Sequence, residues 1–183
     1  RLKHRLFNGQ WSAEIERECM LRPMAVSIIA YDPILDQVIL IRQFRIGAYL
    51  SATNQTPAEQ ESPWILECVA GLLDDPNKTP EQIARKELQE EAGLEAKAMT
   101  FIAKLYTSPG ASNEQVLLFY ATVDASEAGG IYGLKEEGED IKVVAMPYKD
   151  ALQMYKRGQI NNAQCLIALQ WLQINRDRLR STA

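Results

Sequence analysis

Short apolar segments and longer segments with helical spacing alternate along the chain. Six segments combine apolar and β-branched residues over lengths typical of strands: residues 25–31, 37–43, 64–69, 99–106, 115–123 and 141–146. Asp32 and Pro33 separate the first two segments and form a turn signal, so we expect these two strands to pair. The pattern predicts a sheet whose strands are interrupted by helices.

Apolar residues recur with helical spacing near the C-terminal end, at residues 149–157 and 162–178. The second of these predicted helices has a broad apolar face formed by Leu166, Leu169, Leu172 and Ile174. Segment 51–62 is polar, so we expect an exposed loop there. Strands and helices in this order predict an α/β fold with a mixed β-sheet sandwiched between α-helices.

The N-terminal end is predicted to form a separate β-hairpin. Residues 2–7 and 10–20 flank the dipeptide Asn8-Gly9, which favours the tight type I′ turn between two strands. The chain of 183 residues suits one domain with a full core, and it contains no internal repeat or low-complexity segment. We therefore divide it into a hairpin at residues 1–22 and a main domain at residues 23–183.

An acidic segment in the middle of the chain has clear helix boundaries. Thr79 can cap the helix, and Gln82 three residues later completes a capping box. Pro80 suits the first helical position, and Gly93 stands where a left-handed C-terminal residue belongs. The segment predicts a helix over residues 80–92.

This helix carries three glutamates at spacings that place them on one face. Glu87, Glu90 and Glu91 are three or four residues apart. With Ile83 at zero, an ideal helix puts Glu87 and Glu91 at about 40° and 80°, inside the apolar arc that extends to Ala92 near 180°. Adjacent carboxylates in a low-dielectric crevice are costly unless a cation joins them. The pattern therefore predicts a divalent metal site.

Composition narrows the chemistry further. The formal net charge of -4, without any basic run, argues against nonspecific nucleic-acid binding. No apolar stretch approaches a membrane span or a signal sequence, so a cytoplasmic location without a membrane partner is expected. His4 is the single histidine, which excludes polyhistidine zinc sites and argues against a Ser-His-Asp triad. Carboxylates remain as the acid–base and metal-binding groups.

The acidic helix resembles the signature of the Nudix hydrolases, a glycine loop followed by a helix with Arg-Glu and then Glu-Glu-x-Gly. The matching run is Lys86-Glu87-Leu88-Gln89-Glu90-Glu91-Ala92-Gly93-Leu94. The loop from Gly71 is one residue longer than the family pattern, so the expected mid-loop glutamate is replaced by Asn77 or Lys78. Lys86 replaces an arginine; it can pair with Glu90 but lacks the planar fork of a guanidinium.

Nearly the whole chain resembles the ADP-ribose pyrophosphatase branch of this family. The similarity runs from His4-Arg5-Leu6-Phe7-Asn8-Gly9-Gln10 to Ile167-Ala168-Leu169-Gln170-Trp171-Leu172-Gln173. It implies that Glu87, Glu91 and the backbone carbonyl of Ala70 bind metal, with Glu90 adjoining. Oxygen ligands favour Mg²⁺, with Mn²⁺ as a substitute.

A second acidic segment, residues 133–140, matches a mobile loop of that branch. By composition alone it is a solvated surface turn. The resemblance implies that Glu139 supplies a further metal ligand and that Glu137 helps the attacking water. Glu90 is the alternative catalytic base.

Four further residues are implied to contact substrate. Ser108 and Gly110 flank Pro109, which stands about sixteen residues after Gly93, as in ADP-ribose hydrolases; the alternative is an ordinary turn. Arg45 and Arg17 match arginines that contact substrate in related enzymes. The alternative for each arginine is a surface salt bridge. In the family the N-terminal hairpin reaches a second subunit, so Arg17 would complete the partner's site in a homodimer.

The resemblance implies Mg²⁺-dependent hydrolysis of the ADP-ribose diphosphate to AMP and ribose 5-phosphate. Two alternatives stay open: hydrolysis of another nucleoside-diphosphate sugar, such as ADP-glucose or GDP-mannose, and a noncatalytic nucleotide sensor. Family members carry further strands upstream of the hairpin, so we expect the adenine-stacking aromatic residue to lie outside this sequence.

Overall fold

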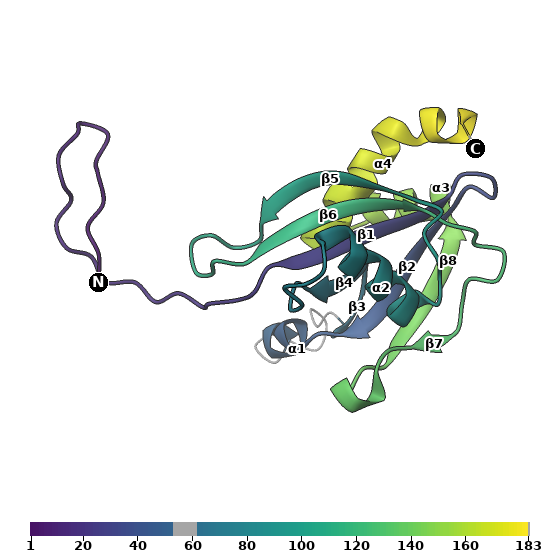
Figure 1. Cartoon of the computed structure of the whole chain (residues 1–183), viewed down its shortest axis with the longest axis horizontal. Coiled ribbons are helices and arrows are strands. Elements are labelled where there is room, and N and C mark those ends of the chain that lie inside the picture. The colour runs from purple at the N-terminus through teal and green to yellow at the C-terminus, as the bar shows by residue number, and fades with distance from the viewer. Residues whose placement is uncertain (53–61, 183) are drawn as a thin grey trace.

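A computed structural model of the chain describes residues 1–52 and 62–182. Its centre is a mixed sheet of eight strands in the order β5-β6-β1-β2-β8-β7, with β3 paired to β2 and β4 paired to β1 (Figure 1). The strands are β1 Ala25–Asp32, β2 Gln37–Phe44, β3 Trp64–Glu67, β4 Val69–Leu72, β5 Ala98–Tyr106, β6 Gln115–Thr122, β7 Ile131–Tyr132 and β8 Ile141–Pro147. β1 and β6 are parallel, and the other pairs are antiparallel.

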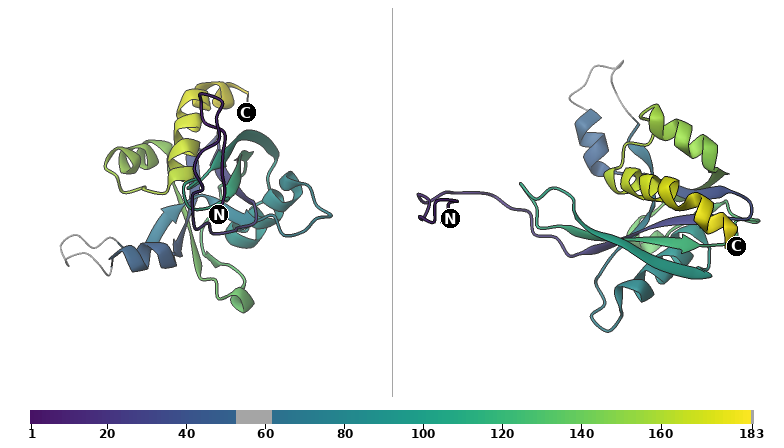
Figure 2. Two further views of the ribbon diagram at one scale, coloured as in Figure 1. Left: turned by 90° about the vertical axis from the view of Figure 1, so that its left-hand side faces the viewer. Right: turned by 90° about the horizontal axis from the view of Figure 1, so that it is seen from above.

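Helices cover both faces of this sheet, as Figure 2 shows. The helices are α1 Ile46–Ala52, α2 Pro80–Ala92, α3 Tyr148–Lys156 and α4 Ala163–Ser181, with a short 3-10 turn at Lys135–Glu137. Strand β1 is buried on both faces because its residues alternate between two cores. Val26 and Ile28 pack with α2, whereas Ile29 and Tyr31 pack with α3 and α4. The α/β class and the helix–sheet–helix layers predicted from the sequence are confirmed.

Helix α2 has the predicted limits, since its end signals are local. The Thr79 hydroxyl accepts the Gln82 N–H at 3.3 Å, and the Gln82 side chain accepts the Thr79 N–H at 2.8 Å. At the other end Gly93 adopts φ 66°, and a Cβ there would lie 2.5 Å from the Tyr132 ring. Gly93 is therefore required both by the helix cap and by the close approach of Tyr132.

Several sequence-based expectations were wrong. The predicted strand 64–69 is two strands separated at Cys68, one pairing with β2 and the other with β1. Residues 51–52 belong to α1, which was not predicted, and 53–61 lie outside the described residues. Ile174 is exposed, whereas Cys165 and Ala168 of α4 are buried. Strand β7 is only two residues long and was also missed.

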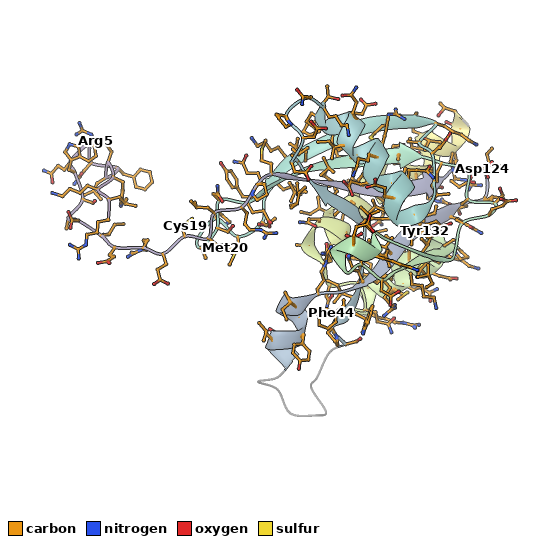
Figure 3. The ribbon with its side chains drawn as sticks, turned by 60° about the horizontal axis from the view of Figure 1, so that its bottom comes forward. Arg5, Cys19, Met20, Phe44, Asp124 and Tyr132 are labelled. Carbon is orange, nitrogen blue, oxygen red and sulfur yellow. The ribbon has the colours of Figure 1, made fainter. Side chains whose placement is uncertain are left out.

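The N-terminal segment extends away from the sheet (Figures 1 and 3). It turns back on itself, but only isolated bridges, Leu2–Ile15 and Arg5–Trp11, join its arms, so the predicted continuous strands are absent. The turn is not type I′, because Asn8 lacks the positive φ that type I′ requires. Instead Gly9 has φ 82° after a turn closed by its N–H to the Leu6 carbonyl at 2.9 Å. Among the described residues, no helix is long and apolar enough to cross a membrane.

Candidate active site

A cavity of about 440 Å³ lies where α2 crosses the ends of the central strands. Its charged lining consists of three cations, Arg22, Arg45 and Lys86, and seven carboxylates, Asp74, Glu67, Glu87, Glu90, Glu91, Glu114 and Glu139. Carboxylates therefore outnumber the cations that face them. A cavity with this excess of negative charge favours a bound cation.

Glu91 is the most deeply buried carboxylate of α2, with 2% of its surface exposed. Its Oε2 accepts the Ala70 N–H at 3.0 Å, which fixes the side chain against β4. Burial raises the pKa of Glu91 to about 8; the Ala70 hydrogen bond opposes this shift, and the charges of Glu139 and Glu87 add to it. The ionised form is thus costly in the metal-free protein, and a divalent cation would remove that cost.

Glu87 lies one helical turn before Glu91 and rests on Gly71 of β4. A Cβ at Gly71 would lie 2.2 Å from Cδ of Glu87, so only glycine leaves room for this carboxylate. Burial raises the pKa of Glu87, with Lys86 opposing the shift. The strand and helix together hold Glu87 and Glu91 at one wall of the cavity.

The two basic residues of α2 point in different directions, as predicted. Lys86 Nζ lies 2.6 Å from Glu90 Oε2 and 3.6 Å from Glu87 Oε1. Arg85 instead donates to Glu81 at 2.9 and 3.0 Å and to the Ala96 carbonyl at 2.7 Å. The positive charge beside the glutamates is therefore Lys86, and Arg85 does not line the cavity.

The acidic loop brings Glu139 into the cavity. Glu139 Oε2 accepts the Leu134 N–H at 3.0 Å, and the Gly133 N–H donates to the Glu90 carbonyl at 3.4 Å, which ties the loop to α2. Gly133 has φ 100°, and a Cβ there would lie 2.7 Å from Cβ of Glu139. Glu137 ends the 3-10 turn, but its side chain lies outside the described part of the structure.

Arg45 follows β2 directly and lines the cavity as part of a partly buried polar cluster. Its Nε donates to Glu67 Oε1 at 2.6 Å, and Asn162 Nδ2, at the N-cap of α4, donates to Glu67 Oε2 at 2.9 Å. Burial raises the pKa of Glu67, whereas the charge of Arg45 lowers it. The salt bridge proposed as the alternative for Arg45 thus exists, and it holds the guanidinium at the cavity wall.

Three predicted substrate contacts lie outside this cavity in the single chain. Arg17 is exposed on the N-terminal arm and donates to the Glu16 carbonyl at 2.7 Å. Ser108 and Gly110 lie in the β5–β6 turn, where the Ser108 carbonyl accepts the N–H groups of Ala111 and Ser112. Their role as substrate contacts stays a prediction.

Other lining residues were missed by sequence reasoning. Glu67 offered a signal, because an acidic residue inside an apolar strand segment needs a partner. Arg22 and Glu114 pair at 3.4 Å between segments ninety-two residues apart, so no local pattern connects them. Asp74 lies two residues after the end of β4 and also lines the cavity.

The lining chemistry fits a divalent cation. Within residues 1–52 and 62–182, no three His, Cys, Asp or Glu side chains already form a metal site. Glu87, Glu91 and Glu139 nevertheless line one cavity, and each of the other two carboxylates adds to the raised pKa of Glu91. Oxygen donors whose charges repel one another are suited to Mg²⁺ or Mn²⁺.

Comparisons with known proteins agree with this geometry. The model of the NUDIX domain matches residues 21–169. The ADP-ribose pyrophosphatase of Escherichia coli strain K12 is 41% identical over 181 residues, covering 99% of this chain and 82% of the relative. The GDP-mannose pyrophosphatase of Cronobacter sakazakii is 36% identical over 163 residues, covering 87% and 78%.

A solved structure, that of an ADP compounds hydrolase, superposes with a TM-score of 0.64 at 25% identity, covering 93% of this chain and 83% of that one. The fold, the acidic helix and the matched domain point to the same assignment. The chain belongs to the Nudix family of hydrolases.

Proposed function

We propose that this protein hydrolyses the diphosphate of ADP-ribose to AMP and ribose 5-phosphate and that it requires Mg²⁺. The main support is the gathering of Glu87, Glu91 and Glu139 in one cavity with Arg45. The similarity to ADP-ribose pyrophosphatases over 99% of the chain favours this substrate. The cytoplasmic location expected from the sequence stays a prediction.

The residues of the cavity divide into metal-binding and substrate-binding groups. Glu87, Glu91, Glu139 and the backbone carbonyl of Ala70 would hold the cation. When bound, Mg²⁺ would acidify the attacking water and neutralise charge that develops on the bridging oxygen. Arg45, held by Glu67, would donate to phosphate oxygens through its terminal nitrogens.

A carboxylate must take the proton of the attacking water. Glu137 and Glu90 are the two candidates. Glu90 lines the cavity and has Oε2 paired with Lys86 at 2.6 Å, so Oε1 is the oxygen available to water. Glu137 is the alternative that the resemblance implies, from the acidic loop.

We also propose a homodimer in which the N-terminal arm reaches the partner subunit. The arm exposes large apolar side chains and extends from the body (Figure 3), with Leu2, Leu6, Phe7 and Trp11 all exposed. Contiguous apolar surface of this kind marks an interaction site. A partner would let Arg17 contact the substrate bound in the other subunit.

The substrate is tested with a panel of nucleoside-diphosphate sugars in the presence of Mg²⁺. ADP-ribose should give the highest kcat/KM, and ADP-glucose and GDP-mannose should be poorer. The similarity to a GDP-mannose pyrophosphatase makes GDP-mannose the principal competitor. Hydrolysis in oxygen-18 water would identify the phosphorus attacked, and binding without turnover would indicate the nucleotide sensor instead.

A further inference from the structure

Gln43, at the floor of the cavity, has a hydrogen-bond acceptor without a partner. Only 8% of the residue is exposed, and its Oε1 is buried with no hydrogen bond within the described chain. Buried side-chain oxygens are nearly always paired, because an unpaired one loses its hydration without compensation. Gln43 also lines the cavity, so a ligand bound there is a candidate partner for this unpaired acceptor.

No donor of the described residues reaches this oxygen, whereas three other polar residues of the site pair with one another. Arg45 Nε and Asn162 Nδ2 both donate to Glu67, at 2.6 and 2.9 Å. Glu67 thus has both oxygens occupied and orders its two donors. Gln43 lines the same cavity, and its Oε1 has no hydrogen bond within the described residues.

Gln43 and Arg45 are two residues apart, and both line the cavity. Side chains two residues apart along an extended chain lie on the same side, separated by about 6.6 Å. Phe44 points to the other side, where its ring packs on Trp64 at 5.8 Å, and Figure 3 shows it beside α1. A ligand whose phosphate contacts Arg45 would therefore reach Gln43 with a group about one sugar unit away.

The partner of Gln43 Oε1 must be a hydrogen-bond donor, which excludes the phosphate oxygens. A hydroxyl both donates and accepts, so it suits a carboxamide in either orientation of the amide. We propose that Gln43 binds a ribose hydroxyl of the nucleotide substrate and so contributes to sugar specificity. This inference rests on the proposed function, which places a diphosphate between two riboses in the same cavity.

The test is a double-mutant cycle in which the parent and Gln43→Leu are each measured with ADP-ribose and with analogues that lack the hydroxyls of one ribose. ADP methyl ester lacks the terminal ribose, and the 2′,3′-dideoxyadenosine analogue of ADP-ribose lacks the hydroxyls of the adenosine ribose. Dissociation constants are measured by calorimetry in EDTA, and kcat/KM is measured with Mg²⁺. Gln37→Leu, on the same strand but outside the cavity, is the matched control.

We expect Gln43→Leu to weaken ADP-ribose binding and to lower kcat/KM by about 5- to 30-fold. With one of the two analogues, the parent and Gln43→Leu should bind equally well. The ribose hydroxyls missing from that analogue are then the ones that Gln43 contacts. The melting temperature of Gln43→Leu should equal or exceed that of the parent, because an unpaired buried oxygen is removed. Gln37→Leu should change neither binding nor kcat/KM.

The assignment would be overturned if Gln43→Leu weakened the binding of ADP-ribose and both analogues equally. It would also be overturned if the substitution weakened the binding of none of the three ligands. Water would then be the partner of Gln43. A parent that binds no ADP-ribose would also overturn it. A parent that binds ADP-ribose with the expected coupling but does not hydrolyse it would refute the proposed function alone.

Discussion

Replacing Glu91 by glutamine tests whether α2 is the metal site. Glutamine keeps the size of the side chain, and its Oε1 can still accept the Ala70 N–H that Glu91 accepts at 3.0 Å. The substitution therefore removes a charge with little change in packing. With Mg²⁺ we expect kcat/KM to fall by at least about 10³-fold, or about 4 kcal/mol, because a neutral amide is a poor substitute for a charged ligand.

The same substitution should stabilise the metal-free protein at high pH. The pKa of Glu91 is raised from 4.5 to about 8, so the folded state binds more protons than the unfolded state between these values. The free energy of unfolding of the parent must then fall as pH rises through this window. The two pKa values differ by about 3.5, which corresponds to a loss of at most about 5 kcal/mol above pH 8.

The assay is urea unfolding in EDTA at pH 5 and pH 8.5. Glu67 and Glu87 also have raised pKa values, so only the difference between parent and Glu91→Gln reports on Glu91 and its neighbours. Glu81→Gln is the control, because Glu81 lies on the same helix but is exposed and pairs with Arg85. Mg²⁺ should raise the melting temperature of the parent more than that of Glu91→Gln.

Two results would refute this reasoning. A stability difference that is equal at pH 5 and pH 8.5 would mean that burial does not penalise the ionised Glu91. Activity of Glu91→Gln within tenfold of the parent would mean that the acidic helix does not bind the essential metal.

Three further predictions concern the rest of the site. Glu139→Gln and Glu137→Gln should each lower kcat much more than they raise KM in steady-state assays, with little change in melting temperature. If both variants keep the kcat of the parent, the loop is a solvated turn without a catalytic role. Lys86→Ala should lower kcat/KM by a factor that corresponds to about 1 to 3 kcal/mol of activation free energy, whereas Lys86→Arg and Arg85→Ala should change kcat/KM little. A large loss of kcat/KM in Arg85→Ala with none in Lys86→Ala, measured at saturating Mg²⁺, would contradict the contacts of these two residues. Gly71→Ala should displace Glu87 and reduce both activity and the thermal shift caused by Mg²⁺, and an unchanged shift would argue against Glu87 as a ligand.

Helix α2 could be read from the sequence because its determinants are local. Thr79, Pro80 and Gly93 act within one turn of the helix ends, and the spacing of Glu87 and Glu91 fixes their common face. The strand segments were also recognisable, since burial on one or both faces leaves a short-range apolar pattern. The acidic helix was thus determined by neighbouring residues along the chain.

Sheet register and pairing required the tertiary structure. The apolar segment 64–69 gave no sign that the chain changes partners at Cys68, because both halves are buried strands. Helix α1 was missed because seven residues are too few to show a helical period, and its last two residues lie in the polar segment 51–62 that predicted a loop. Strand pairing and the start of a short helix depend on which strand lies alongside the segment. The periodicity of the sequence does not identify that neighbouring strand.

The polar cluster around Arg45 was decided by tertiary structure alone. Arg45, Glu67 and Asn162 come from two strands and a distant helix, and they meet only when the sheet and α4 are assembled. Gln43 lines the same cavity and keeps a buried oxygen without a hydrogen bond among the described residues. The sequence determined the acidic helix because its signals lie within one helical turn, whereas long-range packing decided which side chains share the cavity with it.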